Sequence, residues 1–221
     1  MVLLNNLISD PWKIKNIIFD FGGVICDLDI KKTERKFQEF GPLRSPNTRN
    51  EKEQAAMWED LVGSLETAAI TPEEFRQAIR EFYLSSPSDK AIDDAWNALL
   101  TGIPESRIRL LKDISSRYRI FLLSNSNRIH YQHFVEEFQQ KSGYLNFDGL
   151  FEKAYFSFEV HIRKPSKEIF RLVLNNHGLV AGETLFIDDT LEHVLAAIHE
   201  GIIGYHLKDG ADLASLFRSS L

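Results

Sequence analysis

The sequence contains a single cysteine, Cys26, and no apolar run long enough to cross a bilayer. One cysteine cannot form an intramolecular disulfide, so nothing in the chain requires an oxidising compartment. Residues 1–15 hold a short apolar patch with no basic residue before it, which differs from a secretory leader. We therefore expect a cytoplasmic protein that is neither exported nor bound to a membrane.

Basic residues are in the minority, with 26 Lys and Arg against 32 Asp and Glu and a formal charge of −6. This balance disfavours nucleic acid as a partner, and an anionic substrate would need a local positive site. Internal repeats and low-complexity tracts are also absent. The 43% of hydrophobic and 26% of charged residues are typical of a folded globular protein. We expect a monomer that consists of a core and an accessory unit.

Short apolar, β-branched or aromatic runs predict five buried strands. They span 14–21, 118–124, 154–158, 184–189 and 202–207. Most are separated by segments with helical spacing, at 105–118, 127–140, 165–178 and 190–201. Parallel strands need crossover connections, so this alternation predicts a doubly wound α/β core with helices on both faces of a parallel sheet.

One region interrupts the alternation. Between about residues 30 and 100 the sequence predicts no strand but several helices, including 50–66, 71–84 and 88–100. Thr71 followed by Pro72 is typical of a helix start, and 41–50 is the most loop-like stretch. We predict that 30–100 form an α-helical cap inserted into a core made of 1–29 and 101–221.

Polar residues end or follow the predicted strands, at the edge where ligands bind in open α/β sheets. They are Asp20, Ser124, Asn125, Lys164, Asp188 and Asp189. Aspartates that gather around one lysine indicate a divalent cation and an anionic ligand. A serine or aspartate at a strand end can also cap the next helix, and this alternative stays open for Ser124.

Four segments resemble, in order, the motifs of the haloacid dehalogenase superfamily: IIFDFGGV, FLLSNSN, HIRKPSKEIF and LFIDDTLEHVLAA. Metal-dependent phosphatases dominate this superfamily, and the helical insertion resembles its small α-helical cap. The segments FDFGGVICDLD, LLSNSNRIH and RKPSKEIF are most similar to the branch that includes sugar-1-phosphate phosphatases. The resemblance implies Mg²⁺-dependent hydrolysis of small, sugar-like phosphomonoesters.

The resemblance also implies a role for each strand-end residue. Asp20 is the implied nucleophile, which forms an aspartyl-phosphate. The implied Mg²⁺ ligands are Asp20, the backbone carbonyl of Gly22 and Asp189, and Asp188 either joins them or orients a bound water. The implied phosphate-binding residues are Ser124, Asn125 and Lys164.

The chain departs from the superfamily pattern at Gly22, where most of these phosphatases carry an acid/base aspartate. That group is worth about 10² to 10⁴ in rate. Asp27 and Asp29 are candidate surrogates, unless they are solvated or cap the next helix. The 2-haloacid dehalogenases lack the same aspartate and need no metal, so a dehalogenase-type hydrolase is one alternative. A non-catalytic binding protein on this fold is another.

Other residues with chemical potential are assigned to packing. His130 and His133 are one helical turn apart but have no third ligand, so we predict a packing or surface role. Cys26 lies in an apolar segment and is expected to be buried. Ala68 stands where relatives often carry glycine. Core positions are predicted for Trp58, Phe82, Tyr83 and Trp96.

Overall fold

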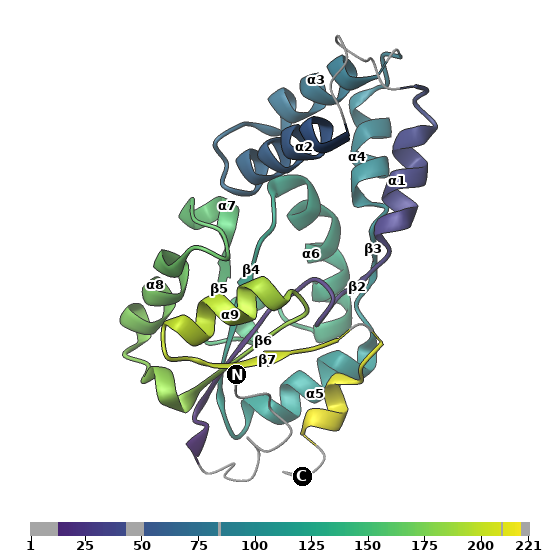
Figure 1. The fold of residues 1–221 in the computed structure, drawn as a ribbon. Coiled ribbons are helices and arrows are strands. Elements are labelled where there is room, and N and C mark those ends of the chain that lie inside the picture. Colours follow the sequence, from purple (N-terminus) through teal and green to yellow (C-terminus); the bar gives the residue numbers. More distant parts are fainter. Residues whose placement is uncertain (1–12, 43–50, 84, 209, 218–221) are drawn as a thin grey trace.

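A computed structural model describes residues 13–42, 51–83, 85–208 and 210–217 (Figure 1). The apolar patch near the start of the chain and most of the predicted loop 41–50 lie outside the described residues. In the described part, no helix combines the length and apolar character needed to cross a membrane. Helices cover both faces of one sheet, and a second group of helices stands above it (Figure 1).

Five strands form the parallel sheet in the order β5-β4-β1-β6-β7, and every neighbouring pair is parallel. Their bounds are β1 Asn16–Phe19, β4 Arg119–Ser124, β5 Lys153–Phe156, β6 Thr184–Asp188 and β7 Ile203–His206. The prediction of a doubly wound α/β fold is confirmed. The strand predicted over 154–158 is shorter than expected, because the helix α7, Ser157–Val160, begins at Ser157. The Ser157 hydroxyl donates to the backbone carbonyl of Ser126 and accepts from its N–H.

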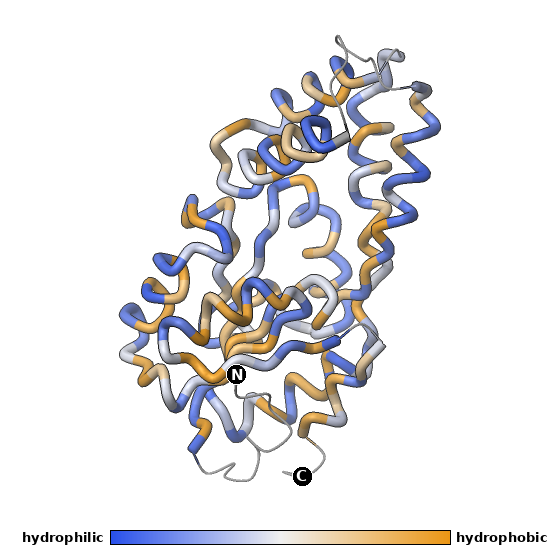
Figure 2. Tube along the Cα trace, in the orientation of Figure 1, coloured by the Kyte–Doolittle hydropathy of each residue, from blue (hydrophilic) through white to orange (hydrophobic). Residues whose placement is uncertain are grey.

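Successive residues of β1 point to opposite faces of the sheet and pack into two different hydrophobic cores. Ile17 and Phe19 pack on one face of the sheet and Ile18 on the other, all with 1% exposure or less. The first face is covered by α5, Glu105–Ser115, and α6, Arg128–Ser142, and the second by α8, Lys167–His177, and α9, Leu191–His199. Short 3₁₀ turns complete the core at Phe147–Gly149, Ala181–Glu183 and Leu213–Leu216. Burial on both faces explains why the strands read as continuous apolar runs, which lie at the centre of the core in Figure 2.

The helices above the sheet have a core of their own, which contains Phe37, Phe75, Ile79, Tyr83, Ile92 and Trp96. These helices are α1 Ile30–Gln38, α2 Glu51–Glu66, α3 Pro72–Phe82 and α4 Asp89–Asn97. The predicted start at Thr71 is confirmed, because Thr71 and Glu74 form a reciprocal capping box. The segment of α1 was not among the predicted helices, since it is mostly charged and buries only Thr33 and Phe37.

Two very short strands join the helical group to the core. β2, Asp27–Leu28, pairs antiparallel with β3, Leu100–Gly102, where the sequence pattern indicated no strand. A second connection runs through α6, whose Ile129 packs into the aromatic cluster of the helical group. The upper helices are therefore tied to the carboxyl edge of the sheet, where the polar strand ends lie.

Candidate active site

Three aspartates meet at the carboxyl edge of the sheet. Asp20 follows β1, and Asp188 and Asp189 end and follow β6. The register of these parallel strands places Phe19 opposite Ile187, and the backbone N–H of Asp20 donates to the carbonyl of Ile187 at 2.9 Å. One carboxylate oxygen from each aspartate lies within 4.8 Å of the other two. The strand ends thus gather the carboxylates that the sequence suggested.

Lys164 joins two of these carboxylates from within the protein. Its side chain is 1% exposed, and Nζ lies 2.7 Å from Asp20 Oδ1 and 2.7 Å from Asp188 Oδ2. Nζ also donates to the carbonyl of Leu123 at 2.9 Å. A buried ammonium group requires such partners, because transfer from water is costly without them.

Asn125 fixes the loop that carries Lys164. Its Nδ2 donates to the carbonyl of Lys164, and its Oδ1 accepts from the backbone N–H of Lys164, both at 2.9 Å. The side-chain amide is therefore used to position the lysine. The phosphate-binding role suggested for Asn125 stays a prediction.

The buried charges do not balance one another. Burial raises the pKa of Asp20 to about 8, and the neighbouring aspartates add to this rise while Lys164 opposes it. Burial also opposes ionisation of Asp188, but Lys164 and His193 outweigh it and lower its pKa to about 2. The pKa of Asp189 is raised by burial and by Asp188. One lysine faces three carboxylates, so the site has a surplus of negative charge.

This surplus and the ligand chemistry fit a divalent cation. Carboxylate oxygens are the ligands that Mg²⁺ prefers in proteins. The loop after β1 also packs tightly against the acidic pair: a Cβ on Gly23, whose φ is +70°, would lie 2.1 Å from Asp189 Oδ2. Gly22 lies in the same loop, where it forms a bridge with Cys26, and the metal-ligand role of its carbonyl stays a prediction.

Further groups hold the aspartates in place. The backbone N–H of Thr190 donates to Asp188 Oδ1 at 2.7 Å, and His193 Nδ1 lies 3.1 Å from Asp188 Oδ2. His206 Nε2 lies 2.9 Å from the carbonyl of Asp189. Neither histidine was predicted as a site residue. The spacing of five residues from Asp188, at the start of the next helix, is the signal that could have identified His193.

Ser124 occupies the end of β4 and is 2% exposed. It does not cap the next helix, so that alternative is wrong. Asn127 is the N-cap of α6, and its side chain accepts from the N–H groups of Ile129 and His130. The nearest hydrogen-bond acceptor found for the Ser124 hydroxyl is the carbonyl of Asn125, at a long 3.4 Å. The phosphate-binding role implied for this hydroxyl stays a prediction.

The two candidate surrogate acids have partners away from the acidic cluster. Asp27 Oδ1 lies 2.6 Å from Arg107 Nη1. Asp29 is the N-cap of α1, where it accepts from the N–H of Lys32, so the capping alternative considered for it is confirmed. The surrogate acid/base role of either residue stays a prediction.

The remaining reactive residues behave as packing groups. Cys26 is fully buried, and burial raises the pKa of its thiol to about 12, so it is not a thiolate at neutral pH. His130 is buried and stacks on Trp96 with ring centroids 4.7 Å apart, whereas His133 is exposed. Within the described ranges, the acidic trio is the one group that meets the criteria for a metal site.

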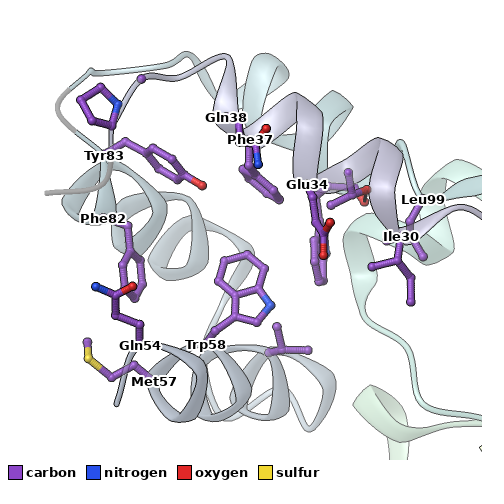
Figure 3. Close-up of a pocket in the computed structure, with 15 residues that line it drawn as sticks. Ile30, Glu34, Phe37, Gln38, Gln54, Met57, Trp58, Phe82, Tyr83 and Leu99 are labelled. Atoms are coloured by element: carbon purple, nitrogen blue, oxygen red, sulfur yellow. Dashed lines mark hydrogen bonds between the residues drawn. The ribbon is translucent and has the colours of Figure 1, made fainter. Parts of the chain in front are cut away.

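The helical group contains an apolar cavity of about 660 Å³ (Figure 3). Aromatic residues from its helices line the space, including Phe37, Trp58, Phe82, Tyr83 and Trp96. Its lining includes neither Lys164 nor the acidic trio. The aromatic residues that were predicted as core therefore pack together and also border this cavity.

A model of haloacid dehalogenase-like hydrolases matches residues 14–201. The chain belongs to this hydrolase family. It is 28% identical over 201 residues to a D-ribitol-5-phosphate phosphatase from Bacteroides thetaiotaomicron, covering 90% of this chain and 94% of the relative. A family enzyme from the same organism, solved in complex with magnesium and inorganic phosphate, is 35% identical with a TM-score of 0.81, covering 93% of this chain and 100% of that one.

A shorter match links this family member to a sesquiterpene phosphatase from Aspergillus oryzae. The two chains are 43% identical over 63 residues, which cover 28% of this chain and 30% of that protein. The haloacid dehalogenase resemblance and the hydrolase class predicted from the sequence are confirmed.

Proposed function

We propose that the protein is a Mg²⁺-dependent phosphatase of small phosphomonoesters that works through an aspartyl-phosphate at Asp20. The observation that carries this proposal is the placement of Asp20 beside Lys164, Asp188 and Asp189 at the carboxyl edge of the sheet. The phosphatase names of the relatives support the same reaction class. A dehalogenase, which needs no metal, would leave the acidic pair without a purpose.

The residues of this chain divide the work of phosphoryl transfer. When bound, Mg²⁺ supplies positive charge that lets the Asp20 carboxylate approach an anionic ester, and the three aspartates with the carbonyl of Gly22 would hold it. An oxygen of Asp20 bonds to phosphorus as the ester bond breaks and the alcohol leaves. Water then attacks phosphorus, releases phosphate and restores the carboxylate. Lys164 and the Ser124 hydroxyl stabilise charge on the phosphoryl oxygens.

The substrate class follows from the relatives and from the proposed cap. We propose that residues 30–100 act as a cap over a core of 1–29 and 101–221, and that the cap selects sugar-like or polyol phosphates, as the D-ribitol-5-phosphate phosphatase does by name. We further propose a cytoplasmic monomer, and the excess of acidic residues disfavours nucleic acid and anionic membranes as partners.

A second substrate class is favoured by the aromatic cavity in the helical group. Its volume of about 660 Å³ is within the range of small-molecule sites, and its lining is rich in aromatic side chains. Such a space suits the apolar alcohol of a terpenyl monophosphate better than a polyol. The partial match to a sesquiterpene phosphatase agrees with this alternative.

A release assay tests the function and separates the two classes. Inorganic phosphate would be measured with D-ribitol 5-phosphate, a panel of sugar phosphates and farnesyl monophosphate, each with Mg²⁺ and with chelator. We expect Mg²⁺-dependent release, with the polyol and sugar phosphates preferred over farnesyl monophosphate. Metal-independent chloride release from 2-chloropropionate, without phosphate release from any ester, would overturn the phosphatase proposal.

A further inference from the structure

The loop after Asp20 packs closely around Gly22, which lacks the side chain of the usual acid/base group. A Cβ built on Gly22 would lie 3.1 Å from Leu28 Cδ1, so the side chain of Leu28 occupies the neighbouring space. Asp27 and Asp29 are held by Arg107 and by the start of α1. Both carboxylates of this loop thus have partners, and we expect an acid for the leaving group to come from another element.

The cap touches the core next to the catalytic lysine. Glu66, the last residue of α2, places Oε2 3.3 Å from Arg163 Nε, and Arg163 immediately precedes Lys164. One residue further, the carbonyl of Thr67 lies 2.9 Å from His161 Nδ1. The end of α2 is thus docked onto the same loop that delivers Lys164 to Asp20.

Glu66 is unusual among the carboxylates at this junction. Its side chain is 15% exposed, and Oε2 is buried without a hydrogen-bond partner, since the contact with Arg163 meets only the distance for an ion pair. A buried carboxyl oxygen without a hydrogen bond is costly, which makes it a candidate for contact with a ligand. Glu59, on the same helix, also faces Arg163, at 3.5 Å, but is 73% exposed.

The surroundings of Glu66 suit a group that both gives and takes a proton. Burial raises its pKa to about 7, with a contribution from Glu59, while Arg163 and Lys164 on the facing core loop oppose the rise. A carboxyl group that titrates near neutral pH is present in both protonation states, as acid and base catalysis require. An exposed glutamate would be almost entirely ionised.

We propose that Glu66 is the acid/base residue of this enzyme, supplied by the cap in place of the side chain that Gly22 lacks. The proposal rests on the phosphatase function proposed above. In the first step, an oxygen of Asp20 bonds to phosphorus and the ester P–O bond breaks. Its electron pair stays on the leaving oxygen, which takes the proton of Glu66 and departs as an alcohol.

The second step restores both groups. The Glu66 carboxylate accepts a proton from water as the water oxygen bonds to phosphorus. The bond between phosphorus and Asp20 then breaks, which returns Asp20 to its carboxylate form, leaves Glu66 protonated and releases inorganic phosphate. Because Glu66 belongs to the cap, catalysis of both steps requires the cap to be docked on the core.

The test compares leaving groups of the same shape but different basicity. Glu66→Gln keeps the size of the side chain and removes its proton exchange. With Mg²⁺, we expect its kcat/KM, which reports the step in which the leaving group departs, to fall about 10² to 10⁴-fold on D-ribitol 5-phosphate and phenyl phosphate, and less than about 10-fold on p-nitrophenyl phosphate, whose leaving group needs no proton. The limb of the phenyl phosphate pH profile near pH 7 should also disappear.

Glu59→Gln is the matched control, because it removes a second carboxylate that faces Arg163 from the same helix. We expect it to change kcat on each ester less than about 2-fold, as is typical for an exposed ion pair. An equal loss of kcat/KM on both aryl phosphates in Glu66→Gln, whether folded or misfolded by circular dichroism, would show a structural role and overturn the inference. So would unchanged rates on both. Inactivity of the wild-type protein on every ester would instead overturn the phosphatase proposal itself.

Discussion

The edge of the sheet and the helical group above it are built in different ways. At the sheet edge, backbone pairing between β1, β4 and β6 sets the positions of Asp20, Ser124 and Asp188, and each of these residues is at least 93% buried. In the helical group, position depends on aromatic packing and on a few contacts with the core, such as that of Glu66 with Arg163. The aspartates are therefore positioned by the strands, while the position of Glu66 depends on how α2 packs against the loop that contains Arg163.

The largest effect should come from the proposed nucleophile at the sheet edge, Asp20. Asp20→Asn removes the attacking carboxylate but keeps the shape of the side chain, so we expect kcat to fall by more than about 10⁴-fold. Phosphate release from p-nitrophenyl phosphate measures the loss. Asp113→Asn, an exposed position on α5, is the control and should remain active. Turnover within 10-fold of wild type in Asp20→Asn would exclude the covalent route.

Removal of the buried cation should be the next largest effect. Lys164→Met leaves Asp20 and Asp188 buried without their shared partner, and we expect the free energy of unfolding to fall by about 3 to 5 kcal/mol in chelator. Added Mg²⁺ should recover part of this loss, because it replaces positive charge at the same carboxylates. Denaturant unfolding measures both values, with the exposed Lys167→Met as the control. An undiminished free energy of unfolding would contradict the charge balance described for the site.

A smaller effect is expected where the core meets the cap, at His130. Burial, with a contribution from His133, lowers the pKa of His130 to about 3, whereas an unfolded histidine titrates near 6.5. Below about pH 6.5, the unfolded state therefore binds more protons at this histidine than the folded state does. The contribution of neutral His130 to the free energy of unfolding is complete above that pH and is lost as the pH falls toward 3. At about pH 4.5 the loss is about 2 to 3 kcal/mol.

Denaturant unfolding at a series of pH values measures this loss. His130→Gln should show a smaller fall in the free energy of unfolding between pH 7 and 4.5 than the wild type. The control, His133→Gln, changes an exposed histidine on the same helix and should retain most of the fall. If the two variants had the same pH dependence, the buried neutral state of His130 would be refuted.

The smallest effect is expected in the turn that follows Glu66. Ala68 has a φ of +54°, a left-handed conformation that costs a residue with a Cβ more than it costs glycine. We expect Ala68→Gly to raise the free energy of unfolding by about 0.5 to 1 kcal/mol, after the greater flexibility of glycine in the unfolded chain is included. Ala69→Gly, at a position without a positive φ, should lower it instead. Thermal unfolding measures both changes. If Ala68→Gly lowered the free energy of unfolding, the turn at Ala68 would not be strained.

The core and its acidic cluster could be predicted from the sequence because both follow from local pattern. Buried parallel strands read as apolar runs, and a polar residue at the end of each run falls on the carboxyl edge of the sheet. Asp20, Ser124 and Asp188 were found in this way. Lys164 was harder to place, because it follows α7 and reaches Asp20 only through the loop that Asn125 holds.

The contacts between the helical group and the core could not be predicted, because they carry no periodic signal in the sequence. β2 and β3 are too short for alternation, and their pairing depends on the fold that surrounds them. Glu66 appears in the sequence as one more charged residue at the end of a helix. Its burial arises only when α2 docks on Arg163, which lies 97 positions further along the chain. The contact of Glu66 with Arg163 therefore depends on the packed structure and not on a local sequence pattern.

Trapping the covalent intermediate tests most directly whether Asp20, at the sheet edge, is the nucleophile. Wild-type protein with Mg²⁺ would be mixed with p-nitrophenyl phosphate, quenched in acid within one turnover, digested and analysed by mass spectrometry. We expect one added phosphoryl group on the peptide that contains Asp20, at the Asp20 side chain, and none in Asp20→Asn. A phosphoryl group on another residue, or its absence from Asp20 at every quench time while phosphate is still released, would contradict the claim.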